Sequence, residues 1–305
     1  VMTDFSAVRE MTPYLSDPPA MAVGTPGKSG YLRLGFELDA SGRSILRDWE
    51  RRAPLIVQQA LYFDEQLPDL PCVYILSSGG PNVDGDRYEQ HITVRRGASA
   101  HVSTGAATKL AAMRYNFSAL RQTFRLEAGA YLEFLPEPTI PCRRTRFWSD
   151  TEFRVDPSAT LFYSEIYLAG RRHHEGERFA YDLLSVASRA YGPDERLLFR
   201  EKFVIRPASR SPETRGAMGG YDVFANAVVL TPPACAEAIY AATECIFDPQ
   251  RQLATGILRL PDGCGLSFRV LGMDSGTVKQ AVRDFCSTVR RTVKGRPLPP
   301  EFPWR

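Results

Sequence analysis

Residues 97–136 read GASAHVSTGAATKLAAMRYNFSALRQTFRLEAGAYLEFLP. Gly-Ala pairs at positions 97–98 and 129–130 each precede a short run in which apolar and polar side chains alternate. Alternation with a period of two is typical of a strand with one buried face, and a glycine at its start is typical of a turn. Residues 103–109, between the two runs, are small and leave no room for bulky packing. The stretch predicts strands separated by turns and by one small-residue loop.

The same strand-like pattern extends in both directions from this stretch. Further runs occur at 31–38, 54–62, 72–76, 91–94, 152–155, 161–166 and 197–204. Helical periodicity is almost absent before Thr231, and no fixed sequence repeat accompanies the strands. Many short strands at fairly even spacing are typical of layered β folds and solenoids. We therefore predict a mainly β fold, in the form of a β-helix-like layered all-β body.

Two helices are predicted in the C-terminal half, near 232–247 and 274–294. In the first, Pro232 and Pro233 suit a helix start, and apolar residues follow at spacings of three and four. In the second, apolar residues from Val278 to Val289 share one face, and Gly295 is typical of the position just past a helix end. Residues 253–273 predict a β-hairpin that turns at 261–263.

The chain of 305 residues divides into a flexible N-terminal segment, residues 1–30, and a single β-rich domain, residues 31–305. The first segment is rich in Pro, Ser and Gly, a composition typical of loosely ordered chain. Although the length alone would suit two domains, all-β chains of this size often form only one.

Composition narrows the class of protein. The formal net charge is +3 and no run of five like charges occurs, so nothing indicates nucleic-acid binding. No apolar stretch is long enough to cross a membrane, and the N-terminus lacks the basic-then-apolar pattern of a signal peptide. The cysteines form no CxxC pair, which argues against a structural zinc site and suits reduced thiols. We predict a cytoplasmic protein that binds neither nucleic acid nor membrane.

Two polar segments are candidates for holding a metal ion. Residues 79–86 include Asp84 and Asp86, which could bind a divalent cation or, alternatively, cap backbone N–H groups in a tight turn. Residues 171–177 read RRHHEGE. In an extended chain His173, Glu175 and Glu177 would share one face, and this donor set suits nickel or zinc. The alternative interpretation of the second segment is a polar hairpin tip closed by Gly176, and most such clusters are solvated.

No complete enzyme motif is recognisable. The small-residue loop lacks the Gly-Lys-Ser/Thr ending of a phosphate loop, and Gly-x-Ser-x-Gly is absent. A carbohydrate-active β-solenoid enzyme with a carboxylate pair remains an alternative. Its candidate carboxylates are Glu127, Glu133, Glu137, Glu152 and Glu165.

From residue 31 to the C-terminus, several motifs resemble the urease accessory protein D/H family. They are PLIVQQALY at 54–62, Gly-Gly at 79–80 followed by Gly-Asp at 85–86, STGAATK at 103–109, GAYLEFLP at 129–136, Glu165, Gly-Arg at 170–171 and GERF at 176–179. Singly each motif is weak, whereas their shared order and spacing are specific. The resemblance implies an elongated β-helix-like body with a few helices.

The resemblance also implies a role without catalysis. Family proteins act as chaperone-like scaffolds for nickel insertion, linking urease apoprotein to accessory proteins F and G, and are thought to contain a water-filled passage for nickel. The resemblance implies transient nickel and no tightly bound cofactor. It assigns the acidic positions of the passage to Asp86 and Glu177, with Glu165 as a further candidate. It assigns the passage wall to Thr104, Ala107 and Thr108.

Overall fold

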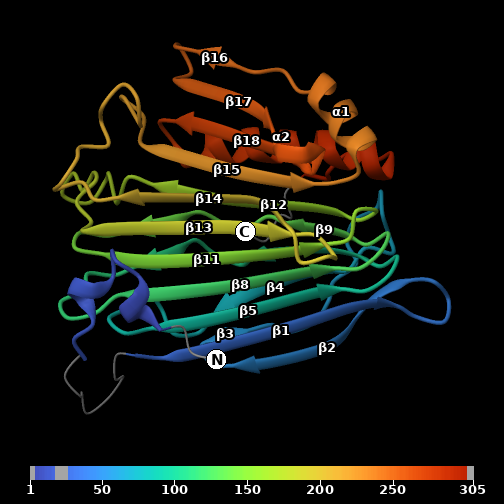
Figure 1. Ribbon diagram of the computed structural model, residues 1–305, viewed down its shortest axis with the longest axis horizontal. Helices are drawn as coiled ribbons and strands as arrows, with labels where there is room; N and C mark the ends of the chain where they lie inside the picture. Colours follow the sequence, from blue (N-terminus) through green and yellow to red (C-terminus); the bar gives the residue numbers. More distant parts are fainter. Residues whose placement is uncertain (1–3, 18–26, 301–305) are drawn as a thin grey trace.

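The computed structural model describes residues 4–17 and 27–300, and the chain forms a mainly β structure with 43% strand and 14% helix (Figure 1). The strands are β1 (Ser29–Leu38), β2 (Ser44–Arg52), β3 (Leu55–Ile56), β4 (Cys72–Ser77), β5 (Arg87–Val94), β6 (Ser99–Thr104), β7 (Thr108–Leu110), β8 (Ser118–Leu126), β9 (Tyr131–Phe134), β10 (Thr139–Pro141), β11 (Arg146–Val155), β12 (Thr160–Leu168), β13 (Leu183–Tyr191), β14 (Leu197–Ile205), β15 (Val223–Leu230), β16 (Phe247–Asp248), β17 (Leu253–Arg259) and β18 (Gly265–Gly272). The helices are α1 (Pro233–Ala242) and α2 (Ser275–Lys294), with short 3-10 helices η1 (Phe5–Ala7), η2 (Thr12–Tyr14) and η3 (Pro261–Gly263). The predicted fold class is confirmed.

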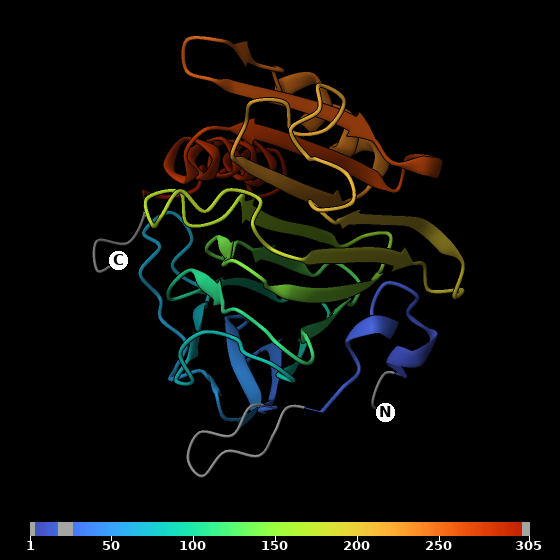
Figure 2. The same ribbon diagram turned by 90° about the vertical axis from the view of Figure 1, so that its left-hand side faces the viewer.

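The strands build two sheets that face each other (Figures 1 and 2). The first sheet runs β14-β13-β11-β8-β5-β1-β2, and the second runs β16-β17-β18-β15-β12-β9-β6-β4-β3, with β10 and β7 paired at its side. In the middle of the body the chain alternates between the sheets, so that β5, β8 and β11 lie parallel in one and β6, β9 and β12 lie parallel in the other. This order confirms a layered β body, while the narrower term β-helix-like stays a prediction.

An aromatic core joins the two sheets. Phe124 and Phe153 of the first sheet meet Phe134 and Tyr163 of the second, with ring centroids 4.9 Å apart for Phe124–Phe134 and 5.0 Å apart for Phe153–Tyr163. All four rings are buried because alternate residues of each strand face the opposite sheet. Burying one large apolar side chain is worth about 1.5–3 kcal/mol, so these rings hold the sheets together.

Helix α2 covers the other face of the second sheet and lies behind β18 in the view of Figure 1. Val278, Val282, Phe285 and Val289 lie at helical spacing and are buried against this sheet. Phe285 stacks on Phe268 of β18 with a centroid distance of 4.2 Å. Within residues 4–17 and 27–300, neither helix has the length and apolar character needed to cross a bilayer.

The ends of α2 are set by capping residues. Asp274 Oδ1 accepts a hydrogen bond of 2.8 Å from the N–H of Thr277, and Gly295 adopts a φ of 69° just past the last turn. The aspartate satisfies an N–H group that has no partner inside the helix. We expect Asp274→Ala to lower the free energy of unfolding by about 1 kcal/mol in urea titrations. Asp284→Ala, at an exposed position of the same helix, should change it by less than about 0.5 kcal/mol. Equal losses in the two variants would contradict the cap.

Helix α1 is shorter than predicted, because the expected extension to residue 247 is wrong. Thr243 leaves the helical conformation with φ −105° and ψ 116°, and Phe247 pairs instead with Ala254 in the β16–β17 hairpin. Pairing between strands gives these backbone groups their hydrogen-bond partners outside the helix. The hairpin predicted at 253–273 is confirmed as β17 and β18, which are joined through η3.

Residues 4–17 lie against the outer face of the first sheet. Met11 is fully buried there in a cluster with Phe117 and Trp148, and Glu10 pairs with Lys202 of β14 at 2.5 Å. The flexibility predicted for residues 1–30 and the single domain predicted for 31–305 stay predictions. Residues 1–3, 18–26 and 301–305 of those two ranges lie outside the described residues.

Candidate functional site

A cavity of about 440 Å³ lies between the sheets, where the small-residue loop crosses from β6 to β7. Thr104, Ala107 and Thr108, the residues assigned to the passage wall, all line this cavity. A Cβ on Gly105 would come within 2.2 Å of Leu76 Cδ2, so a larger residue at this position would require the Leu76 side chain on β4 to move. The loop therefore covers the cavity closely without filling it.

A row of polar side chains crosses the inner face of the first sheet. Gln90, Gln122 and Thr151 are cross-strand partners in β5, β8 and β11, and the same register continues through Ser188 of β13 to Glu201 of β14. Gln122 Nε2 donates to Gln90 Oε1 at 2.9 Å, and Thr151 Oγ1 donates to Gln122 Oε1 at 3.3 Å. Buried polar groups need hydrogen-bond partners, and Gln90, Gln122 and Thr151 supply them to one another between the two sheets.

Glu165 of β12 faces the polar row from the second sheet. Its Oε2 atom accepts hydrogen bonds from the hydroxyl groups of Tyr163 at 3.2 Å and Tyr167 at 3.0 Å. Burial raises the pKa of the Glu165 carboxyl to about 7. The two hydrogen bonds act in the opposite direction and lower this pKa, whereas the nearby charge of Glu201 raises it further. Asn226 Nδ2 donates to Glu201 Oε2 at 3.4 Å. Two carboxyl groups and an amide therefore meet where the polar row ends.

Replacing Glu165 by Gln is expected to change the pH dependence of stability. A carboxyl group whose pKa is raised by folding favours the folded state at low pH, and this advantage disappears as the pH rises from the unfolded value near 4.5 to the folded value of about 7. The loss is on the order of 3 kcal/mol. In urea titrations at about pH 5 and pH 8, Glu165→Gln should gain stability relative to the parent at the higher pH. Glu244→Gln, at an exposed position, should follow the parent. Parallel behaviour of both variants would contradict the raised pKa.

Asp86 lies outside the cavity lining. Its fully buried carboxylate accepts hydrogen bonds from the N–H groups of Lys28 and Val83, each at 2.9 Å, and from the Tyr88 hydroxyl at 3.0 Å. The Lys28 ammonium lies 3.0 Å from Asp86 Oδ2. Asp84 likewise accepts backbone hydrogen bonds. These contacts favour the turn interpretation of residues 79–86, and a metal role for Asp86 stays a prediction.

Glu177 also lies away from the cavity. Arg171 donates to its carboxylate at 2.9 and 2.7 Å, and this pairing is the main reason why the pKa of Glu177 is lowered. Residues 172–176 form turns, with Glu175 at a φ of 51°, so the extended chain that would align His173, Glu175 and Glu177 does not occur. His173 and Glu175 are exposed. Metal handling by these three residues stays a prediction.

The glutamates considered for a glycosidase pair are spread over the molecule. Only Glu137 and Glu165 line the cavity, and Lys279 Nζ lies 2.8 Å from the Glu137 carboxylate. The other three are Glu127, Glu133 and Glu152. Within residues 4–17 and 27–300, no group of three or more His, Cys, Asp or Glu residues is arranged to hold a metal ion. The carbohydrate-active alternative therefore depends on one pair, of which one member is already ion-paired.

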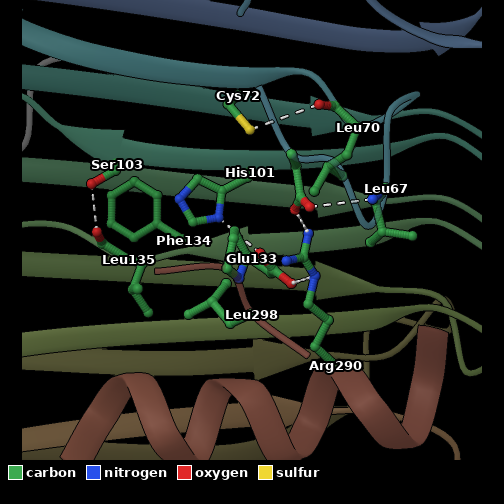
Figure 3. Close-up of polar contacts among 12 residues, drawn as sticks. Leu67, Leu70, Cys72, His101, Ser103, Glu133, Phe134, Leu135, Arg290 and Leu298 are labelled. Carbon is green, nitrogen blue, oxygen red and sulfur yellow. Dashed lines mark hydrogen bonds and ion pairs between the residues drawn. The ribbon is translucent and has the colours of Figure 1, made fainter. Parts of the chain in front are cut away.

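A second polar cluster lies between α2 and the face of the second sheet that is turned away from the cavity (Figure 3). Arg290 Nε lies 3.0 Å from Glu133 Oε1, and the same guanidinium pairs with Asp64. Glu133 is also bonded by His101 Nδ1 at 2.8 Å and by the Tyr131 hydroxyl at 2.5 Å. Burial acts to raise the pKa of Glu133, but His101 and Arg290 hold that pKa below its ordinary value. The Arg290 cluster fastens α2 to the sheet.

Sequence reasoning missed the polar row. A signal was present, because Gln90, Gln122 and Thr151 interrupt inward-facing positions that are mostly apolar, and they recur 32 and 29 residues apart. Using that signal requires the register between strands, which alternation within one strand does not provide. Glu201 is flanked by charged residues in the sequence, so no change from apolar to polar positions marked it as a member of the row.

Comparison with known proteins identifies the family to which the chain belongs. Residues 28–305 match the family described as UreD urease accessory protein. Urease accessory protein UreD 2 of Brucella suis is 43% identical over 297 residues, covering 97% of this chain and 98% of the relative. UreD of Yersinia enterocolitica is 43% identical over 303 residues, covering 97% and 92%. UreD 3 of Methylorubrum populi is 46% identical over 299 residues, covering 97% and 96%. The chain therefore belongs to the UreD family of urease accessory proteins.

Proposed function

We propose that this chain is a non-enzymatic urease maturation factor of the cytoplasm. It links urease apoprotein to accessory proteins F and G and helps nickel to reach the urease active site. Family membership over nearly the whole chain supports the urease role. Nickel is the cargo in this proposal, and no cofactor stays bound.

The observation that carries the nickel part is the polar row. It extends from the cavity, which Gln90 and Gln122 line, to Glu201 at the edge of the first sheet. Scattered oxygen donors attract a divalent cation, and without a closed coordination shell they also let it leave. An approaching cation favours the ionised form of Glu165, whose pKa of about 7 allows it to release its proton near neutral pH.

Co-expression tests the proposal directly. Urease apoprotein and the other accessory proteins are produced with and without this chain, and urea hydrolysis and the nickel content of purified urease are measured. We expect inactive, nickel-poor urease only when the chain is absent. Equal activity and nickel content in both preparations would refute a maturation role.

A matched pair of variants separates the nickel path from the scaffold. Gln122→Leu removes a polar group from the row at nearly constant volume, whereas Gln280→Leu makes the same change at an exposed position of α2. The first variant should lower the nickel content of urease several-fold and still co-purify with the partner proteins. The second should match the parent. Full nickel loading with Gln122→Leu would argue against a path along the polar row.

A further inference from the structure

The first sheet ends at β14, whereas the second sheet continues beyond the corresponding position. Among the described residues β14 pairs only with β13, while β15, β18, β17 and β16 extend the second sheet past β12. Figure 1 shows β18, β17 and β16 above the level of β14. One face of β15 and β18 packs against α2. The opposite face extends beyond β14, where the first sheet has no further strand to cover it.

A groove of about 670 Å³ occupies this place. Phe203, Val204 and Ile205 of β14 line one side, and Phe224 of β15 and Leu271 of β18 line the other. Successive side chains of a strand point to opposite faces, so three consecutive lining residues mean that the groove follows the backbone edge of β14. An unpaired strand edge presents N–H and C=O groups to which another extended chain can bind.

The charges at the groove indicate the kind of chain that fits. Arg206 and Arg210 line it, and neither forms an ion pair with any residue in the described ranges. Arg206 Nη2 donates to the carbonyl oxygen of Glu10 at 3.3 Å, whereas Arg206 Nε is buried without a hydrogen-bond partner among the described residues. Arg269, by contrast, is already paired with Glu201. Guanidinium groups without a counter-ion favour a carboxylate.

We propose that the edge of β14 binds an extended segment of a partner protein as an added strand of the first sheet. The segment places apolar side chains against Phe224 and Leu271 and a carboxylate against Arg206 and Arg210. Main-chain hydrogen bonds supply affinity in this mode of recognition, and the side-chain contacts supply specificity. That the partner belongs to urease maturation rests on the proposed function. The groove also contains Glu201, so the bound segment would lie at the end of the polar row.

Hydrogen–deuterium exchange tests the strand addition. The full chain is measured alone and in complex with urease apoprotein and accessory proteins F and G. Amides of residues 203–206 should exchange several-fold more slowly in the complex than in the isolated chain. If the slowing instead appears in the isolated chain as its concentration rises, a second copy of the chain occupies the edge and the proposal is overturned.

Charge and shape variants test the side-chain contacts. Arg210→Glu, at an exposed position, and Leu271→Asp should each reduce co-purified partner protein several-fold. Arg251→Glu, at a side chain that is 78% exposed, and Leu38→Asp, at a residue 40% exposed at the end of β1, are the matched controls and should bind as the parent does. Circular dichroism and thermal unfolding identify any variant that fails to fold. If Leu271→Asp fails to fold, Arg210→Glu alone provides the test of the side-chain contacts.

The outcomes separate this proposal from the proposed function. Unchanged binding by folded Arg210→Glu, together with unprotected amides at 203–206 in an active complex, overturns only the docking site. Failure of the parent chain to bind any urease maturation protein overturns both. Slowed exchange at 203–206 with weakened binding of Arg210→Glu and unaffected binding of Arg251→Glu supports the docking site.

Discussion

Arg290→Met is expected to lower the free energy of unfolding by about 3–5 kcal/mol, because it removes the cation from a buried ion-pair cluster. The side chains of Arg290 and Glu133 are both 0% exposed and that of Asp64 is 2% exposed, so water cannot replace the lost partner. Methionine preserves most of the unbranched stem, which limits the loss of packing. Urea titration at neutral pH measures the change. Arg291→Met, on the exposed side of the same helix, should shift it by less than about 0.5 kcal/mol.

The pH dependence distinguishes lost charge from lost packing. In the parent, the pKa of Glu133 is lowered, so its contribution to stability is present above the unfolded pKa and is lost as the pH falls through the folded pKa. Without Arg290, burial is opposed mainly by His101, and the pKa of Glu133 rises. The variant should therefore recover stability relative to the parent as the pH is lowered. A deficit of equal size at acid and neutral pH would show that packing alone was lost.

The contrast between α2 and the Arg290 cluster shows what local sequence can predict. The apolar face of α2, its cap Asp274 and its final Gly295 all lie within one continuous segment, and the structure has the helix where that segment predicts it. One of the two carboxylate partners of Arg290, Asp64, lies 226 residues away, and no periodicity within either segment indicates the pair. Helix α1 ends early for the same kind of reason, since Phe247 pairs with a strand that follows it.

The same distinction between local sequence and contacts in space applies to the candidate site. Composition alone marked the small-residue loop, and Thr104, Ala107 and Thr108 do line a cavity. Residue patterns had offered Asp86 and Glu177 as metal ligands and Glu165 as a candidate carboxylate, and the resemblance assigned all three to the passage. Glu165 lies in the same cavity, whereas Asp86 and Glu177 do not. The last two carboxylates are held by Lys28 and Arg171, contacts that depend on how loops meet in space. The polar row needed the register of five strands, which only the structure supplies.

Ala107→Trp is expected to lower the nickel content and activity of urease by an order of magnitude while the accessory complex still forms. Ala107 is half-buried and lines the cavity of about 440 Å³, so an indole ring at this position would occupy space through which we propose that nickel passes. Constriction of a conducting path affects transit more strongly than it affects the outer surface that binds partners. Nickel per urease active site, urea hydrolysis and size-exclusion chromatography of the complex are the three measurements.

Two controls make this result specific to the cavity. Ala241→Trp adds the same ring at an exposed position of α1, and Ala107→Ser keeps the cavity residue small; both should load nickel as the parent does. Tryptophan fluorescence should be blue-shifted in Ala107→Trp relative to Ala241→Trp, because the ring in the cavity is shielded from water. If the ring is buried and the complex is intact, normal nickel loading would exclude this cavity from the path. A loss of nickel that tracks a loss of complex would instead mean that Ala107 serves partner binding, since an obstructed path leaves assembly unchanged.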